Sequence, residues 1–437
     1  MTVAVTRTKA EQAYSETFEA VAAKLPGGRA VADARKAAIG AFAGRGFPHR
    51  RIEEWKYTDL RSALKDALPP AIADTTPVTL QEIDAALEGL AALDAHRVVF
   101  VNGTHRPELS AIGTAAGLEV GPLAASLGDA LTRASPQGQE AVIALNTAFM
   151  TDGALIRVGK GATLAKPVLL VFVRAGTEPH LVTTRNSLKV GDGARATVIE
   201  AHLALPGAGA GQANTLSEIA VGDGASLTHV KCTLEGPATS HVAGWLATLG
   251  TKSRYHAFHL TAATGLVRNN LQVTFKGEGA KLDISGCFLG RDTEHIDTTL
   301  VVDHAVPSCE SRELFKGVLA GKARGIFQGK VIVRPDAQKT DGKQMAQVLM
   351  LSEEAEFDSK PELEIYADDV VCGHGSTAAE LDADLLFYMR SRGIPLEEAR
   401  ALLIESFVGE ALDKVEDESL REALSAMAIG RLASLVA

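Results

Sequence analysis

Cys372 and His374 are the two residues of this chain whose types and spacing most favour metal chemistry. They lie two positions apart, where a strand-like alternation gives way to a helical pattern. Side chains two apart in an extended segment leave from the same face, so the thiol and the imidazole can reach one ion or one partner group. A thiolate and a neutral imidazole suit iron or zinc, and the metal would release the thiol proton on binding.

Two donors do not complete a metal site. Four-coordinate sites need further ligands, and the sequence offers no Cys-x-x-Cys pair or other ligand motif near this turn. The missing donors would come from distant positions, from a partner protein or from an exogenous thiol. The residues alone also allow a structural interpretation, in which Cys372 is a small buried hydrophobe and His374 hydrogen-bonds the turn.

No catalytic signature accompanies this pair. The sequence contains no Gly-x-Ser-x-Gly elbow, no His-Glu-x-x-His pair and no P-loop. Solenoid enzymes that cleave polysaccharides use acidic residues clustered on strand faces. The acidic residues that could play this part are scattered in the sequence, at Asp283, Glu310, Asp336 and Asp341. A β-solenoid carbohydrate-active lyase or hydrolase therefore stays open as an alternative function.

The composition describes a large, acidic, folded protein. The chain has 437 residues and a formal net charge of −10, which is enough material for two or three structural units. The acidic balance argues against a general binder of nucleic acid or of anionic membranes. The 4 cysteines are widely spaced and favour a reducing compartment. Because neither a signal-like segment nor a bilayer-length apolar run stands out, we expect a cytoplasmic protein.

A Gly-x-Gly-Ala phrase recurs through the middle of the chain and predicts the fold. Its copies begin at Gly159, Gly191, Gly222 and Gly277, and alternating apolar residues precede the last three. Such a unit is typical of a strand, a tight turn and a second strand, with glycine at a position of positive φ. The first three copies recur about every 30 residues, which favours the stacked coils of a β-solenoid. The longer gap before the fourth copy leaves a β-sandwich open.

Helical patterns flank this β region and divide the chain into four expected units. These are an N-terminal helical region (1–68), a mixed α/β connection (69–150), the β core (151–376) and a C-terminal helical domain (377–437). Thr377 and Glu380 have the spacing of a capping box, which predicts that a helix starts there. Trp55 lies among charged residues, where tryptophan usually anchors one element on another. The helical tail fits a dimer contact, a partner dock or a cap on the solenoid end.

Six segments of the sequence resemble the SufB/SufD family, the scaffold subunits of the SUF iron-sulfur cluster assembly system. They are residues 51–60, 327–330, 337–344, 361–369, 372–375 and 386–393. The Glu-Glu-Trp-Lys-Tyr stretch within the first segment and the turn around Cys372 are similar to SufD-type rather than SufB-type members. The family usually has serine and alanine where this chain has Gly373 and Ser376. Neither difference removes a donor.

The resemblance implies a mainly β protein with a right-handed parallel β-helix core between N-terminal and C-terminal helical domains. It also implies a scaffold that is not an enzyme. Such a scaffold pairs with a SufB-type subunit through the β-helix and binds a SufC-type ABC ATPase through the C-terminal helices. A homodimer of the isolated chain is a further option, and neither nucleic acid nor membrane is an expected partner.

The resemblance gives Cys372 and His374 a specific place. His374 would lie at the SufB interface, near a SufB cysteine where a nascent cluster forms, with Cys372 beside it. The chain alone would hold no tightly bound cofactor, and iron or a nascent iron-sulfur cluster would be bound transiently in the complex. ATP-driven dimerisation of two SufC subunits would then rearrange the interface and expose the site, as a population shift.

Overall fold

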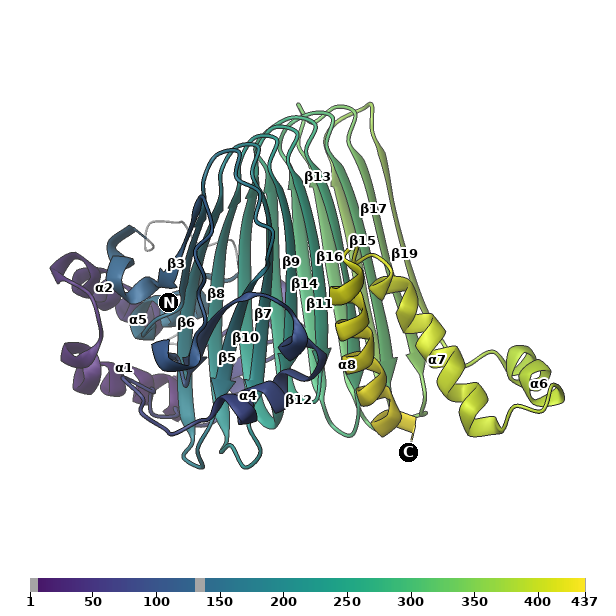
Figure 1. The fold of residues 1–437 in the computed structure, drawn as a ribbon, viewed down its shortest axis with the longest axis horizontal. Coiled ribbons are helices and arrows are strands. Elements are labelled where there is room, and N and C mark those ends of the chain that lie inside the picture. Colours follow the sequence, from purple (N-terminus) through teal and green to yellow (C-terminus); the bar gives the residue numbers. More distant parts are fainter. Residues whose placement is uncertain (1–6, 130–137, 437) are drawn as a thin grey trace, which may run out of the picture.

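The computed structural model describes residues 7–129 and 138–436, so parts of the expected N-terminal region and connection lie outside it. The body is a flattened β-solenoid made of two sheets that lie face to face (Figure 1). Each coil contributes one strand to each sheet, because consecutive strands from β4 onward alternate between them. Strands of successive coils pair in parallel, which confirms the predicted solenoid and excludes the sandwich.

The first sheet, called the odd sheet here, ends at β19 and runs back through the odd-numbered strands to β1 and β2. All its pairings are parallel except that between β1 and β2. Its strands are β1 (His96–Val101), β2 (Thr104–His105), β5 (Val168–Arg174), β7 (Arg195–Ala204), β9 (Ser226–Leu234), β11 (Arg254–Ala262), β13 (Lys281–Gly290), β15 (Glu310–Leu319), β17 (Asp341–Met350) and β19 (Val371–Ala379).

The second sheet, called the even sheet, ends at β18 and runs back to β4 and β3. Only β3 and β4 pair antiparallel. Its strands are β3 (Leu118–Pro122), β4 (Ala154–Val158), β6 (His180–Val190), β8 (Gly211–Val221), β10 (Gly236–Leu249), β12 (Thr264–Phe275), β14 (His295–His304), β16 (Arg324–Val333) and β18 (Glu356–Ile365).

The inner face of each sheet, meaning the face turned toward the other sheet, carries the main apolar core. Alternate residues along each strand point inward, so one set fills the space between the sheets and the other set faces outward. Inward residues such as Val198, Leu227, Ile284 and Phe327 are fully buried in this core. The register between coils therefore decides which side chains share the interior.

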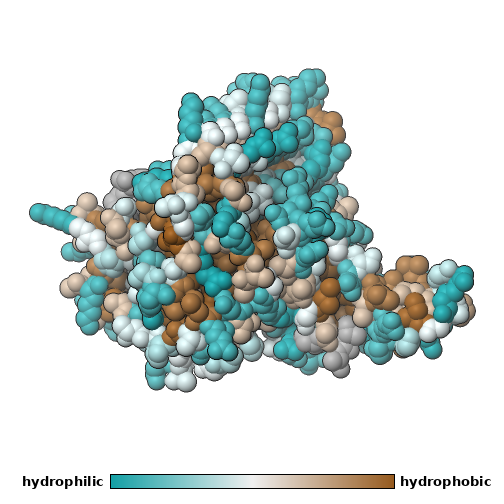
Figure 2. Space-filling model, viewed as in Figure 1, coloured by the Kyte–Doolittle hydropathy of each residue, from teal (hydrophilic) through white to brown (hydrophobic). Residues whose placement is uncertain are grey.

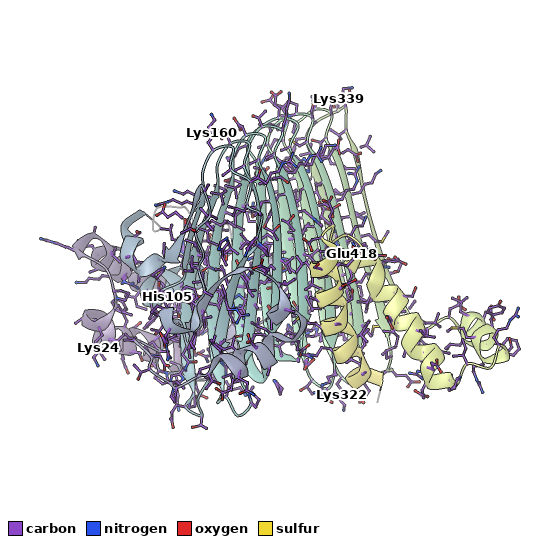
Figure 3. All side chains as sticks on the ribbon, in the orientation of Figure 1. Lys24, His105, Lys160, Lys322, Lys339 and Glu418 are labelled. Atoms are coloured by element: carbon purple, nitrogen blue, oxygen red, sulfur yellow. The ribbon has the colours of Figure 1, made fainter. Side chains whose placement is uncertain are left out.

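The turns along one rim of the solenoid stack on one another, and most hold one residue at positive φ. Four of them use glycine, at Gly161, Gly193, Gly224 and Gly279. Between the last two of these lies a further coil whose turn uses Lys252, at φ 54°. The longer gap before the fourth Gly-x-Gly-Ala copy therefore contains an ordinary coil, whose turn has Lys252 in place of a glycine at positive φ. Lys160 and Lys339 mark this rim in Figure 3, and Lys322 marks the opposite rim.

The N-terminal helices cover the outer face of the even sheet. They include α1 (Lys9–Val21), α2 (Arg29–Arg45), α3 (Leu60–Ala63) and α5 (Glu140–Phe149), whereas α4 (Leu80–Leu87) packs on the odd sheet. Tyr14, Phe18 and Phe149 form edge-to-face aromatic contacts in this cluster, which also contacts Leu216 and Leu246 of the even sheet. The helical patterns predicted for this part of the chain are confirmed.

Trp55 anchors the N-terminal region to the solenoid, as predicted. It lies in a short 3₁₀ helix (Glu53–Trp55) and is fully buried. The guanidinium of Arg268, on β12, lies 4.5 Å from the centre of its ring, and the indole Nε1 donates to the carbonyl of Gly138 at 2.6 Å. Further along, Glu53 pairs with Lys360 of β18 at 2.6 Å. The segment thereby ties the middle coils to the last one.

The C-terminal tail consists of α6 (Ala383–Ser391), α7 (Leu396–Leu412) and α8 (Glu418–Val436). Helices α7 and α8 lie on the outer face of the odd sheet (Figure 1), where Ile404, Val408, Leu424 and Met427 are buried. Helix α6 projects beyond the body and has no buried residue. The tail is therefore both a cover for the sheet and a projecting arm.

The helix start predicted at Thr377 is wrong. Thr377 lies within β19, which continues to Ala379, and α6 begins at Ala383. The actual cap is Asp382, whose carboxylate accepts hydrogen bonds from the amides of Asp384 and Leu385. Strand pairing with β17 reaches Ala379 and overrides the local capping signal, because ladder hydrogen bonds already satisfy these backbone groups.

Replacing Lys252 by glycine should stabilise the solenoid by up to about 1 kcal/mol. A non-glycine residue in the left-handed region costs about 1–2 kcal/mol, which the greater flexibility of unfolded glycine partly offsets. Denaturant unfolding would measure the change, with Lys276→Gly, whose backbone is not in that region, as the control. A loss of stability equal to that of the control would contradict the assignment of this turn to the repeat.

Candidate functional site

Cys372 and His374 lie on the terminal strand of the odd sheet. Within the described chain, β19 pairs with β17 on one side and has no strand on the other. Both side chains belong to the inner face, in register with Gly342 and Gln344 of β17. Cys372 is half-buried against the core between the sheets, and His374 is exposed. The predicted shared face is confirmed.

A space opens beneath Cys372, because its register partner is a glycine. A Cβ added to Gly342 would lie 3.7 Å from the Cys372 Sγ and 3.4 Å from the Ser311 Oγ. Ser311 is the next inward residue along this row and is itself in register with Gly342. The hydroxyl of Ser311 in turn lies 3.1 Å from the Nε2 of His304. The polar side chains of Ser311 and His304 therefore extend from Cys372 toward the interior of the solenoid.

The Cys372 thiol is held in its protonated form by its surroundings. Partial burial raises its pKa above the ordinary value, and the nearby carboxyl groups of Asp341 and Glu313 act in the same direction. A backbone hydrogen bond from Gly342 opposes this rise. A metal that binds here must therefore displace the thiol proton, as thiolate coordination generally requires.

Cys372 and His374 alone would not complete a metal site. Across residues 7–129 and 138–436, no three His, Cys, Asp or Glu side chains are arranged to hold a metal ion. Cys372 and His374 are thus a pair of donors at an exposed strand edge, and coordination numbers of four need ligands from outside this part of the chain.

Comparison with known proteins identifies the family of this chain. The model described as "SUF system FeS cluster assembly, SufBD core domain" matches residues 172–407, and that of the SufBD protein N-terminal region matches residues 8–170. The iron-sulfur cluster assembly protein SufD of Escherichia coli is 33% identical over 86% of this chain and 87% of its own length. An iron-sulfur cluster assembly SufBD family protein of Synechocystis is 33% identical over 86% of this chain and 85% of its own length. The chain belongs to the SufBD family.

Membership of the SufBD family confirms the resemblance and connects this chain with iron-sulfur cluster assembly by the SUF system. SufD of Bacillus subtilis is also similar, at 29% identity over 64% of each chain. The match to the SufBD core begins in β5 and ends in α7, so it includes the stacked coils, the strand with Cys372 and the projecting helix α6. No helix in the described ranges has both the length and the apolar character that a bilayer span requires.

Sequence reasoning missed Glu313, which lines the same cavity as Cys372 and His374. It lies on the inner face of β15, 3% exposed, and neither carboxyl oxygen has a hydrogen-bond partner among the described residues. Burial raises its pKa to about 8, against a smaller opposing effect of the nearby Ser311 hydroxyl. The available signal was its place between the inward residues Ser311 and Phe315, where an acidic residue breaks the apolar alternation.

A cavity of about 560 Å³ borders β19 and is lined in part by Cys372 and His374. It is bounded by the outward residues Lys343 and Met345, by Gly373 and by Lys414 from the connection between α7 and α8. A Cβ added at Gly373 would meet nothing within 4 Å. The donor pair therefore lies in the wall of this cavity.

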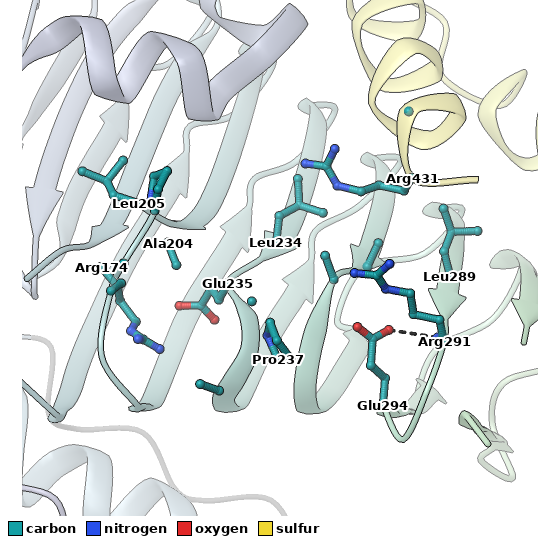
Figure 4. A pocket seen from close by; sticks show the side chains of 18 of the residues that line it. Arg174, Ala204, Leu205, Leu234, Glu235, Pro237, Leu289, Arg291, Glu294 and Arg431 are labelled. Atoms are coloured by element: carbon teal, nitrogen blue, oxygen red, sulfur yellow. Dashed lines mark hydrogen bonds between the residues drawn. The ribbon is translucent and has the colours of Figure 1, made fainter. Parts of the chain in front are cut away.

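A second cavity of about 520 Å³ lies far from the donor pair, between the opposite rim and the end of α8 (Figure 4). Its charged residues already have protein partners. Arg174 donates to Thr239 and to the carbonyl of Gly209, Glu294 accepts from the amide of Arg291 at 3.0 Å, and Arg431 pairs with Glu88 at 2.6 Å. The charged groups named here are therefore engaged within the protein, and Arg431 joins α8 to the 3₁₀ helix that begins at Glu88.

The interior of the central coils holds a buried polar network that the sequence did not reveal. Glu200 accepts hydrogen bonds from Ser217 at 2.8 Å and from His229 at 3.0 Å. Lys231 is buried beside them, donates to Asn269 at 3.1 Å, and has its pKa lowered to about 8 by burial. These residues lie on inward positions of several coils, so only the register brings them together.

The acidic residues that left a carbohydrate-active enzyme open do not form a catalytic pair. Glu310 pairs with Lys281 at 2.9 Å and Asp341 pairs with Arg312 at 2.6 Å, both on the outer face of the odd sheet. Asp336 lies exposed in a turn, and Asp283 lies on the outer face of β13, between the inward residues Leu282 and Ile284. Glycoside cleavage uses two opposed carboxyl groups, one of them with a raised pKa. The observed ion pairs supply neither feature.

Replacing Glu313 by glutamine should stabilise the protein increasingly as pH rises. A carboxyl whose folded-state pKa is raised binds more protons in the folded state than in the unfolded state. The free-energy cost that it adds to folding is therefore absent below pH 4.5 and grows up to about pH 8. The neutral amide carries no such penalty. We expect the variant to gain on the order of 3 kcal/mol relative to the wild type between pH 5 and 8.5.

Thermal or denaturant unfolding at several pH values would measure this gain. Glu310→Gln, on the outer face of the same strand, is the matched control and should show no such rise. A stability difference between Glu313→Gln and wild type that stays constant with pH would contradict the assigned pKa.

Proposed function

We propose that this SufBD protein is a non-enzymatic scaffold subunit of a SufBCD-type complex in the cytoplasm. It pairs with a SufB-type subunit through the end of the β-helix and binds a SufC-type ABC ATPase through its C-terminal helices. Cys372 and His374 contribute ligands to a nascent cluster at the seam with the SufB-type subunit. The observation that carries the proposal is an incomplete donor pair on the unpaired terminal strand of the solenoid.

The end of the solenoid has the properties of a protein interface. An unpaired strand edge presents free backbone donors and acceptors and is ready to pair with another chain. Apolar side chains gather at the same end, where Tyr366 is 59% exposed and Val371 is 62% exposed. Covering this end with a partner would bury them and bring the partner's side chains to Cys372 and His374.

The partner would complete the metal site. Iron and sulfide are the cargo of this assembly, and thiolate and imidazole ligands both occur in iron-sulfur proteins. Because the described chain supplies two donors, the SufB-type subunit is assigned the remaining ligands, which include a cysteine in the related complexes that the resemblance implies. A second copy of this chain would instead bring two copies of the same pair across a two-fold axis.

The projecting helix α6 has the properties expected of the surface that binds the ATPase. Helix α6 exposes Leu385, Phe387 and Tyr388 by 50%, 74% and 55%, and Figure 2 shows hydrophobic surface on this projection. An exposed apolar group of this size, rimmed by charged residues, is typical of a protein-binding surface. ATP binding and dimerisation of two SufC-type subunits would pull on the arm and shift the seam between two arrangements.

Substitution of His374 by alanine should leave the complex assembled but lower its cluster content several-fold. The side chain is exposed and packs against little, so its loss removes a donor without disturbing the fold. Anaerobic co-purification with the SufB-type and SufC-type subunits, with iron and sulfide quantified, would measure both effects. His180→Ala, at the start of β6, is the control. An unchanged cluster yield would remove His374 from the site.

Substitution of Phe387 by glutamate should weaken ATPase binding at least tenfold, because apolar anchors carry most of the energy of such interfaces. Leu80→Glu, at a position of α4 that is 45% exposed, is the control. These point variants test the dock more sharply than deletion of the tail, which would uncover the outer face of the odd sheet. Unimpaired binding of the SufC-type subunit by Phe387→Glu in a pull-down titration would place the dock elsewhere.

A further inference from the structure

A row of buried polar side chains runs directly beneath His374. In the parallel ladder of the odd sheet, Glu313 of β15 pairs with Gln344 of β17, which pairs with His374 of β19. Neighbouring strands lie about 4.8 Å apart, so side chains in one row contact one another. Gln344 is 4% exposed, and the residue below Glu313 in the same row is the apolar Ile284. The polar row therefore begins two coils below His374 and ends at it.

The amide of Gln344 is oriented by a contact across the solenoid. Its Nε2 donates to the carbonyl of Gly329 on the even sheet at 3.4 Å. The amide occupies the space beside Gly329, because a Cβ added there would lie 2.2 Å from the Gln344 Oε1. Since only the NH₂ end of an amide can donate to a carbonyl, the contact determines which end is the oxygen. The Oε1 of Gln344 is buried and has no partner among the described residues.

Glu313, in register with Gln344 on the adjacent strand, supplies a second unsatisfied group. Both of its carboxyl oxygens are buried without partners in the described chain. With its pKa raised to about 8 by burial, the carboxyl is largely protonated at neutral pH and can donate an O–H. Buried polar atoms without partners are rare and costly in folded proteins, so two of them in adjacent positions beneath His374 call for a function.

We propose that Gln344 is a positioning residue for His374, whose ring N–H donates to the Gln344 Oε1 while the carboxyl of Glu313 donates to the same oxygen. A carbonyl oxygen has two lone pairs and can accept both bonds. The bond fixes which imidazole nitrogen carries the proton and turns the other nitrogen toward the end of the solenoid. Metal-binding imidazoles commonly donate their second nitrogen to an oxygen in this way.

The inference rests on the proposed function, because orienting His374 serves the complex only if His374 binds metal there. The preferred tautomer itself is a property of the isolated chain. It also explains the order of residues in the row. The amide of Gln344 both accepts and donates, so it can link a carboxyl below to an imidazole above. A carboxylate directly beneath His374 would add a charge at this position, whereas the amide adds none.

Nitrogen NMR of the full chain labelled with ¹⁵N in its histidine rings would test the proposal. The signals of His374 are assigned by their loss in His374→Ala. In the wild type we expect one neutral tautomer to exceed the other by about tenfold, which corresponds to one ordinary hydrogen bond. Gln344→Met, which keeps the side-chain length, should bring the two tautomers close to equal population.

Two further variants separate positioning from packing. Glu313→Gln should keep the tautomer preference, because its amide N–H₂ can donate where the carboxyl does, whereas Glu313→Leu should reduce it. Gln347→Met, on the outer face of the same strand, should change nothing at His374. Unaltered signals of the buried His229 and His241 would show that each variant folds. A Gln344→Met protein whose His374 spectrum equals that of the wild type would overturn the proposal.

The outcome is distinguishable from that of the proposed function. Cluster yield of the co-expressed complex tests whether His374 is a donor, and the NMR measurement tests whether Gln344 orients it. If both hold, Gln344→Met should also lower the cluster yield several-fold while leaving the complex assembled. If Gln344→Met shifts the tautomer of His374 but His374→Ala keeps the full cluster yield, the positioning contact stands and the metal role of His374 is rejected.

Discussion

Parallel backbone pairing between successive coils is the constraint on which the rest of the structure depends. Each inner coil satisfies its backbone donors and acceptors through the coils on both sides. The last coil has a neighbour on one side, so its free edge must be covered by something else or stay exposed. The N-terminal end is partly closed by the short antiparallel strands β2 and β3. The C-terminal end, with β18 and β19, has no comparable closure in the described chain.

The same pairing divides the surfaces of the molecule between separate tasks. Helices α7 and α8 bury the outer face of the odd sheet, and the N-terminal helices bury part of the even sheet. The terminal edge and the projecting helix α6 stay unburied. In a SufBD protein these two exposed parts lie at either end of a short connection, between Ala379 and Ala383. A movement of the arm can therefore act directly on the strand that carries Cys372 and His374.

The sequence predicted the parts that local patterns determine. The donor pair needs only a period of two, and the solenoid is visible because its turns require positive φ at regular intervals. The coil with Lys252 was hidden because a lysine can adopt that conformation at a modest cost. The cap predicted at Thr377 failed because pairing with β17, a contact distant in sequence, outweighs a local hydrogen bond. Trp55 was correctly assigned as an anchor from its charged surroundings.

The polar interior could not be predicted, because it depends on register. Glu313, Gln344 and His374 are about 30 residues apart in the chain and become neighbours only when parallel strands pair in one particular alignment. A shift of one residue would turn each of them outward. Glu200, His229 and Lys231 in the central coils meet for the same reason. Such residues are recognisable in sequence only as polar interruptions of an apolar alternation.

The most direct test of the account is whether the ring nitrogen of His374 binds iron in the assembled complex. The chain would be labelled with ¹⁵N-histidine, combined with unlabelled SufB-type and SufC-type subunits, loaded with iron and sulfide without oxygen, and studied by pulsed electron paramagnetic resonance in a paramagnetic state. The account predicts a ¹⁵N coupling to the cluster that disappears in His374→Ala. A cluster without any ¹⁵N coupling, or with a coupling that survives in His374→Ala, would contradict it.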